Sequence, residues 1–220
     1  PPPPFFNDPA TTYIYSLSQH DALPIYRVYD IIVNSNLYCS KYSELNDPFE
    51  GQYNYYYGDS TAGVAECGVD ECGSDGNHQM VIQNDLIKIC SLSKSFDDVR
   101  MWSFYADGHK GICIEIELVG YSEQDLVPIQ YEQEEKQVTH EIPNERTIKN
   151  VLSRKSYHWD YEKEIRLFSK TSIHHFSGYI RSVILGHRTS EIEEKMIKKI
   201  APDVAIKRAK IDLNYSIRIQ

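Results

Sequence analysis

The sequence predicts an α+β domain in which a central mixed or antiparallel twisted sheet is flanked by helices. Residues 111–118 alternate Ile with polar or small side chains, which is typical of a half-buried strand. Residues 190–200 combine a capping box with an apolar stripe, which indicates an amphipathic helix. Strand-like and helix-like segments mix without regular βαβ alternation, so a parallel α/β sheet is not expected.

The remaining elements follow from local patterns along the chain. Further strands are expected over 37–40, 88–92, 126–131, 164–169, 179–185, near 206 and over 211–219. Further helices are expected to end near Asn34, to lie between a cap at Asp97 or Asp98 and Gly108, and to span Glu145–Ser156. Residues 52–77, which are rich in Tyr, Gly and Asp, are expected to form a loop or an irregular insertion.

The helix with the clearest signals spans Glu191–Ile200. Ser190 and Glu193 have the spacing of a capping box, and Pro202 follows the end of the helix. Its expected buried stripe consists of Ile192, Met196, Ile197 and Ile200.

Size and charge narrow the classes of function. The 220 residues fit one domain or at most two small ones. The net charge of −9 argues against general nucleic-acid binding, and binding through a local basic groove is the alternative. No stretch approaches the roughly 18–20 apolar residues of a membrane span, and no signal peptide is recognisable. Five cysteines at irregular spacing do not suggest a secreted disulfide framework. A cytoplasmic protein without a membrane partner is therefore predicted.

The first 25 residues stand apart from the rest. Residues 7–25 resemble the in-frame translation of a sequencing-library adapter, NDTATTEIYTLSLHDALPI, and differ from it at Pro9, Tyr13, Ser16 and Gln19. We therefore expect residues 1–25 to be an artefactual leader of a metagenomic or draft read, disordered or loosely attached. A genuine Pro-rich leader is the alternative. Residues 26–220 are expected to form the single domain.

Five segments of the domain carry a family resemblance. They are Leu-Tyr-Cys-Ser-Lys-Tyr-Ser-Glu-Leu-Asn-Asp-Pro-Phe-Glu-Gly over 37–51, Ile-Cys-Ser-Leu-Ser over 89–93, Met-Trp-Ser-Phe-Tyr-Ala-Asp-Gly-His-Lys-Gly over 101–111, Trp-Asp-Tyr-Glu-Lys-Glu-Ile-Arg over 159–166, and Val-Ile-Leu-Gly over 183–186. Their order and spacing resemble a bacterial family known only as domain of unknown function 2971. That family usually opens with a strand like Leu-Tyr-Lys-Tyr-Arg, and here the adapter-like segment occupies its place.

The family pattern in turn resembles that of the ADP-ribosyltransferases, with strand, helix and strand near the start and an acidic motif near the end. The likeness implies an NAD-dependent effector in a toxin or phage-defence context. Glu162 and Glu164 match the Glu-x-Glu motif of one class of these enzymes. In ADP-ribosyltransferases the first strand usually supplies an Arg or His that grips the dinucleotide. Arg27 is the nearest basic residue here, so this version of the chain is expected to be poorly active.

Glu162, Glu164 and Arg166 are the candidate catalytic residues. If all three extend the strand that follows, their spacing of two places them on one face, with Ile165 and Leu167 on the other. One carboxylate would then stabilise an oxocarbenium-like ribose, and the other would activate or orient the acceptor. The alternative is a solvated strand face with a surface ion pair.

The candidate substrate-binding residues fall in four short stretches of the sequence. They are Tyr38 and Ser40, Asn46 and Asp47, then Trp102, Tyr105 and His109, and finally Trp159 and Tyr161. For Asn46 and Asp47 the alternative is a structural turn, for Trp102 a core position, and for His109 a hydrogen bond at a helix end. A non-catalytic binding or sensor domain of a phage-defence system is the alternative function.

No metal and no firm cofactor are predicted, and NAD is considered only as a substrate. Cys67 and Cys72 have C-x4-C spacing near His78, but a second cysteine pair is missing, so zinc is not expected. The acceptor is not readable from the sequence. A protein or a nucleic acid would suit the implied chemistry.

Overall fold

The computed structural model describes the backbone of residues 11–16, 25–49, 51–56, 78–81, 87–133, 137–139, 144–213 and 216–220. It describes the side chains of residues 27–49, 51, 87–133, 144–213 and 216–220. The considered zinc ligands Cys67 and Cys72, and the side chain of His78, lie outside these ranges.

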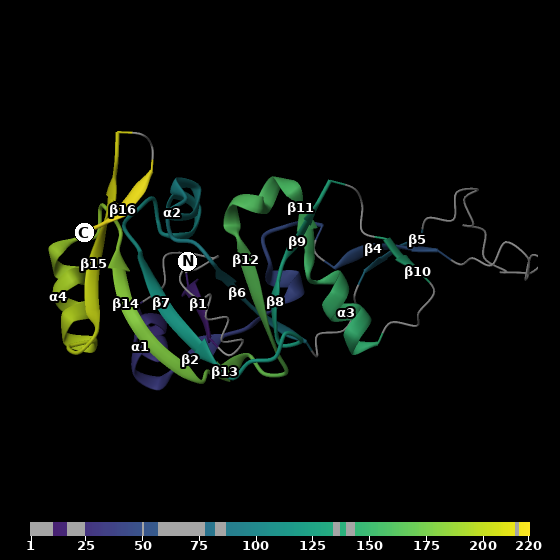
Figure 1. The fold of residues 1–220 in the computed structure, drawn as a ribbon, viewed down its shortest axis with the longest axis horizontal. Helices are drawn as coiled ribbons and strands as arrows, with labels where there is room; N and C mark the ends of the chain where they lie inside the picture. Colours follow the sequence, from purple (N-terminus) through teal and green to yellow (C-terminus); the bar gives the residue numbers. More distant parts are fainter. Residues whose placement is uncertain are drawn as a thin grey trace, which may run out of the picture.

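A nine-stranded sheet dominates the described part of the chain (Figure 1). Its main path runs in the order β16 (Ile217–Ile219), β15 (Ala205–Ile211), β14 (Gly178–Leu185), β7 (Ile112–Val119), β1 (Thr11–Ser16), β6 (Lys88–Ser93), β12 (Glu164–Ser169) and β8 (Leu126–Pro128). The additional strand β3 (Ser40–Lys41) pairs with β6. Strands β14 and β15 are parallel and the other pairs of this sheet are antiparallel, so the predicted mixed sheet and α+β class are confirmed.

Smaller pairings extend the fold beyond this sheet. Strands β4 (Gln52–Tyr56), β5 (His78–Val81) and β10 (Gln137–Thr139) form a three-stranded sheet at the right of Figure 1. Strand β9 (Gln130–Glu132) pairs in parallel with β11 (Arg154–Ser156), and β2 (Asn36–Tyr38) pairs antiparallel with β13 (Ile173–His175). Strand β4 lies within the segment that was expected to be irregular.

Four α-helices and two 3₁₀ helices complete the described elements. They are α1 (Ile25–Asn34), α2 (Val99–Tyr105), α3 (Glu145–Val151), α4 (Glu191–Ile200), η1 (Tyr42–Glu44) and η2 (Tyr157–Glu162). The predicted N-caps are confirmed: the Asp98 side chain accepts a hydrogen bond from the Arg100 amide, and Ser190 forms a capping box with Glu193.

The two faces of the sheet carry different cores because alternate strand residues point in opposite directions. One face packs against α1 and α4, through Val28 and Ile197 among others, in a cluster with Ile114 and Leu167. On the opposite face one cluster forms around α2 and another around α3. The stretch of β6 and β12 between these two clusters is lined by polar side chains, and it holds Glu164 and Arg166 of the candidate catalytic residues.

Residues 11–16 of the adapter-like segment form β1 in the middle of the sheet. Their register runs from Thr11 opposite Val119 to Ser16 opposite Ile114, and Tyr15 also pairs with Ser93 of β6. The sequence Thr-Thr-Tyr-Ile-Tyr-Ser is rich in β-branched and aromatic residues, which suit a strand. This stretch is therefore paired on both sides, whereas loose attachment was expected of the leader. Its foreign origin stays a prediction.

Two helix predictions need correction. The helix expected over Glu145–Ser156 ends at Val151, because Arg154–Ser156 joins β9 as a parallel strand. The buried stripe predicted for α4 is wrong at Ile192, which is 72% exposed, and at Met196, which is 42% exposed. Ile197 is the stripe residue that the core buries.

Candidate functional site

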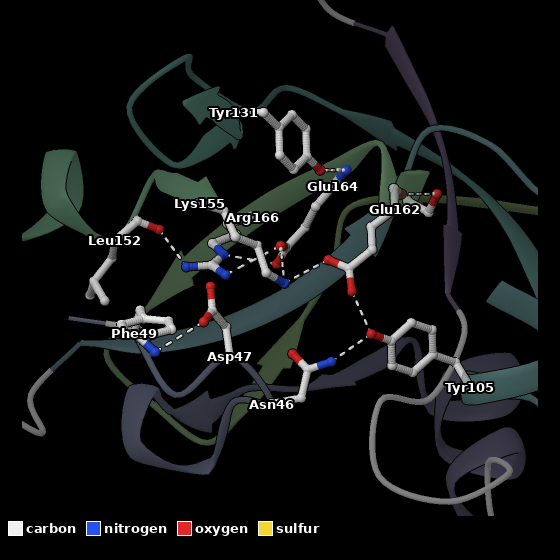
Figure 2. A network of polar contacts seen from close by, with 11 residues as sticks. Asn46, Asp47, Phe49, Tyr105, Tyr131, Leu152, Lys155, Glu162, Glu164 and Arg166 are labelled. Carbon is white, nitrogen blue, oxygen red and sulfur yellow. Dashed lines mark hydrogen bonds and ion pairs between the residues drawn. The ribbon is translucent and has the colours of Figure 1, made fainter. Parts of the chain in front are cut away.

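Polar side chains from four separate stretches of the chain meet on the α2–α3 face of the sheet (Figure 2). Asn46 and Asp47 come from the loop after η1, and Tyr105 comes from the end of α2. Lys155 comes from β11. Glu162, Glu164 and Arg166 come from the end of η2 and from β12. We call Lys155, Glu162, Glu164 and Arg166 the ionic cluster.

The ionic cluster is buried, and its members pair with one another. Lys155 Nζ lies 2.6 Å from Glu162 Oε2 and 3.3 Å from Glu164 Oε2. Arg166 donates from Nε to Glu164 Oε1 at 2.8 Å, from Nη2 to Glu164 Oε2 at 3.2 Å, and from Nη1 to the Leu152 carbonyl at 2.5 Å. None of its four side chains is more than 3% exposed. The predicted alternative of a solvated strand face is therefore wrong.

The geometry of the motif differs from the expected continuous strand. Glu162 is the last residue of η2, and only Glu164 and Arg166 lie on β12. Between them Lys163 adopts a left-handed conformation with φ 45° and ψ 43°, which is uncommon for a residue other than Gly. This single residue turns the chain from the 3₁₀ helix into the strand. Both carboxylates nevertheless reach Lys155.

Backbone contacts fix the positions of both glutamates. The Glu164 amide donates a 2.7 Å hydrogen bond to the Tyr131 hydroxyl, and Ser93 Oγ donates a 2.6 Å bond to the Glu162 carbonyl. Ser93 lies directly opposite Glu164 in the β6–β12 register, so the two residues share one face of the sheet. The backbone of Glu164 is thus held by strand pairing and by the Tyr131 hydroxyl, and that of Glu162 by the Ser93 hydroxyl.

Tyr105 links the ionic cluster to the Asn46 loop. Its hydroxyl donates to Glu162 Oε1 and accepts a 2.5 Å hydrogen bond from Asn46 Nδ2. Burial and the adjacent Glu162 charge raise the pKa of Tyr105, so the phenol stays protonated and remains a donor. The resulting chain runs from Asn46 through Tyr105 and Glu162 to Lys155.

The two carboxylates are electrostatically unequal. Burial and the neighbouring Glu164 charge raise the pKa of Glu162, although Lys155 and Tyr105 oppose this shift. Burial also acts to raise the pKa of Glu164, but the charges and hydrogen bonds of Arg166 and Lys155 outweigh it and bring the value to about 2. Glu164 is therefore committed to its internal cations, whereas Glu162 is the carboxylate more ready to exchange a proton.

Two acceptor oxygens beside the ionic cluster lack partners among the described residues. They are Asn46 Oδ1 and Asp47 Oδ2, both shielded from solvent. The other carboxylate oxygen of Asp47 accepts a 2.9 Å hydrogen bond from the Phe49 amide. In Figure 2 the Asp47 carboxylate points toward the Arg166 side of the cluster. A buried acceptor without a donor costs about 1–3 kcal/mol, so these atoms suit a hydrogen-bonding guest.

The aromatic candidates Trp159 and Tyr161 lie next to the ionic cluster. Lys155 Nζ sits 4.7 Å from the centroid of the Trp159 ring, whose centroid is 6.2 Å from that of Tyr161. The Arg100 guanidinium covers Tyr161 at 4.1 Å. Both rings therefore lie beside the charges of the ionic cluster, and their role in binding a substrate stays a prediction.

The other predicted binding residues lie in different surroundings. Tyr38 is 40% exposed and stacks under the Arg27 guanidinium at 3.9 Å, while Ser40 Oγ donates to the Ile89 carbonyl at 3.3 Å. Trp102 is fully buried in the α2 core, where Nε1 donates to the Phe96 carbonyl. His109 stacks on Trp102 at 6.5 Å and hydrogen-bonds Ser103 at 3.1 Å. None of the four takes part in a described hydrogen bond or ion pair of the ionic cluster.

Sequence reasoning missed Lys155 and Tyr131. Lys155 fell within the helix expected over Glu145–Ser156, whereas in the structure Arg154–Ser156 pairs with β9 and Lys155 is buried. Tyr131, on β9, reaches the Glu164 amide through its hydroxyl. A buried cation was nonetheless foreseeable, because two glutamates and one arginine leave an unbalanced negative charge if they are buried together.

The depressed pKa of Glu164 predicts how stability depends on pH. Its folded pKa of about 2 lies below the ordinary value of 4.5, so its stabilisation is complete above pH 4.5 and is lost as the pH falls toward 2. We expect a loss of about 3 kcal/mol over this window in urea unfolding. Replacing Glu164 by Gln should flatten this part of the profile. Parallel profiles for the two proteins would contradict the assignment.

Comparison with known proteins gives no match to any family model, any curated protein or any solved structure. Within the described segments, no three His, Cys, Asp or Glu side chains are grouped so that they could hold a metal ion. None of the helices in those segments has the length and apolar character needed to cross a membrane.

Proposed function

We propose that the domain is an ADP-ribosyltransferase-like enzyme that cleaves NAD, and that it belongs to the domain of unknown function 2971 family. The observation that carries this proposal is the hydrogen-bonded chain from Asn46 through Tyr105 to Glu162. It joins three of the sequence segments on which the family resemblance rests. A toxin or phage-defence role is the biological context that the resemblance implies.

In the proposed reaction the bond between C1′ of the ribose and the nicotinamide nitrogen breaks, and nicotinamide leaves with the bonding electrons. The positive charge that develops on the ribose is stabilised by the Glu162 carboxylate, as carboxylates do in glycoside hydrolysis. A nucleophile then attacks C1′ and gives up its proton to a carboxylate or to water. With water as the acceptor, the products are ADP-ribose, nicotinamide and a proton.

The members of the ionic cluster have separate roles in this proposal. Arg166 and Lys155 hold Glu164, whose low pKa keeps it charged across the working range. The Glu164 charge favours a raised pKa at Glu162, while Lys155 and Tyr105 orient the Glu162 carboxylate. Glu162 is therefore the proposed catalytic carboxylate, and Glu164, Lys155 and Arg166 are positioning residues.

A non-catalytic binding domain is the second candidate, and burial favours it. Glu162 and Glu164 are only 2% and 3% exposed, and both are already paired with internal cations. Such a cluster satisfies itself without a substrate. Under this alternative the protein would bind NAD or ADP-ribose without breaking a glycosidic bond.

Nicotinamide release tests the enzyme proposal. We expect slow release from NAD by the chain as it stands, because β1 reads Thr-Thr-Tyr-Ile-Tyr-Ser and offers no basic side chain to grip the dinucleotide. Replacing residues 1–25 by a strand like Leu-Tyr-Lys-Tyr-Arg should raise the rate of release. We call this variant the repaired chain. Release is followed by chromatography, and NAD binding by calorimetry. Binding without release would favour the binding domain, and the absence of both from the repaired chain would remove the NAD proposal.

A further inference from the structure

The loop corner formed by Asn46 and Asp47 has the properties of a recognition point for hydrogen-bond donors. Asp47 is only 3% exposed, and one of its carboxylate oxygens has no hydrogen-bond partner among the described residues. The side-chain oxygen Oδ1 of Asn46 is also shielded from solvent and also lacks a partner among the described residues. An amide oxygen and a carboxylate oxygen are both hydrogen-bond acceptors. A guest at this corner must therefore supply donors.

The charges around the corner restrict the guest further. Lys155 and Arg166 balance Glu162 and Glu164, so the ionic cluster contributes no net charge when all four groups are ionised. Asp47 then adds one negative charge, and no ion pair of Asp47 is found among the described residues. A cationic or neutral donor is favoured there over an anion, so a phosphate group is a poor fit.

The two acceptors belong to adjacent residues, which bears on the kind of donor group they suit. Asn46 and Asp47 are consecutive, and Asn46 is tied through Tyr105 to Glu162. Two hydroxyls on adjacent carbon atoms present two donors side by side. The vicinal diol of a ribose can supply one donor to each of the two oxygens, and a positive charge on the ring attached to that ribose matches the surplus negative charge.

We propose that Asn46 Oδ1 and Asp47 Oδ2 bind the 2′,3′-diol of a cationic nucleoside, the nicotinamide riboside end of NAD. This assignment rests on the proposed function for the identity of the ligand. It places the ribose beside Glu162, and it directs the pyrophosphate and the adenosine away from the Asn46–Asp47 corner. Asp47 is thereby a binding residue that discriminates ribose from deoxyribose.

A ligand–variant cycle with the full chain tests this inference. Binding of nicotinamide riboside and of its 2′-deoxy and 3′-deoxy analogues is measured by calorimetry for the wild type and for Asp47→Asn. That substitution keeps the acceptor for the Phe49 amide and replaces the other oxygen by a donor. Asp203→Asn, at an exposed position after α4, is the matched control. Thermal unfolding checks that each variant is folded.

We expect the wild type to bind the riboside about 10-fold or more tightly than at least one deoxy analogue. Asp47→Asn should lose a similar factor for the riboside and almost nothing for that analogue, while Asp203→Asn should behave as the wild type. Equal wild-type binding of all three ligands, or no binding at all, would overturn the inference even if Asp47→Asn does not fold. Independent losses from the variant and from the missing hydroxyl would also overturn it.

The same data separate this inference from the proposed reaction. Diol-dependent binding that requires Asp47, together with no nicotinamide release, would refute the reaction and leave the recognition site standing. Nicotinamide release by a protein in which Asp47→Asn changes neither affinity nor diol preference would refute the recognition site alone.

Discussion

Replacing Arg166 by Met is expected to lower the free energy of unfolding by about 3–5 kcal/mol. Arg166 is fully buried and holds both oxygens of Glu164, and one of its amino groups also satisfies the Leu152 carbonyl. Met has a similar length but no charge, so Glu164 would remain buried with Lys155 as its remaining described cation. Urea unfolding monitored by circular dichroism measures the loss.

Arg181→Met provides the matched control for this prediction. Arg181 also pairs with a buried carboxylate, that of Glu117, but its own side chain is 47% exposed. Water screens such a pair, so its removal should cost less than about 1 kcal/mol. Equal losses in the two variants would show that burial does not distinguish the ionic cluster from an ordinary surface pair.

The sequence was informative wherever a local pattern determines the structure. The alternation over 111–118 corresponds to β7, the capping box at Ser190 starts α4, and the strand expected over 164–169 has the bounds of β12. Periodicity and capping depend on residues close in the chain, so a single sequence contains them.

The features that were missed depend on contacts between distant segments. The turn at Lys163 is an unusual conformation for Lys and has no sequence signal. The pairing of β11 with β9 overrides local helix propensity and buries Lys155. The apolar residues Ile192 and Met196 match a helical stripe, but the core buries Ile197 and leaves these two exposed. Tertiary packing decides each of these cases.

Replacing Glu162 by Gln is expected to lower the rate of nicotinamide release by about 10²–10³-fold. Gln keeps the shape of Glu and can still accept from Tyr105, but it removes the negative charge that faces the developing oxocarbenium ion. It also leaves Lys155 paired with Glu164. The loss should therefore appear in kcat, measured at saturating NAD on protein shown to be folded.

The central claim, that Glu162 is the catalytic carboxylate, is tested most directly by nicotinamide release from NAD by the Glu162→Gln variant of the repaired chain. The control is Glu123→Gln, which changes an exposed carboxylate on the loop before β8. If Glu162 lies at the reacting centre, the rate should fall by at least about 100-fold while NAD affinity changes little and the protein stays folded at the assay temperature. The control should keep the full rate. A Glu162→Gln protein that is folded and releases nicotinamide as fast as its parent would show that the ionic cluster is structural and that NAD chemistry does not occur there.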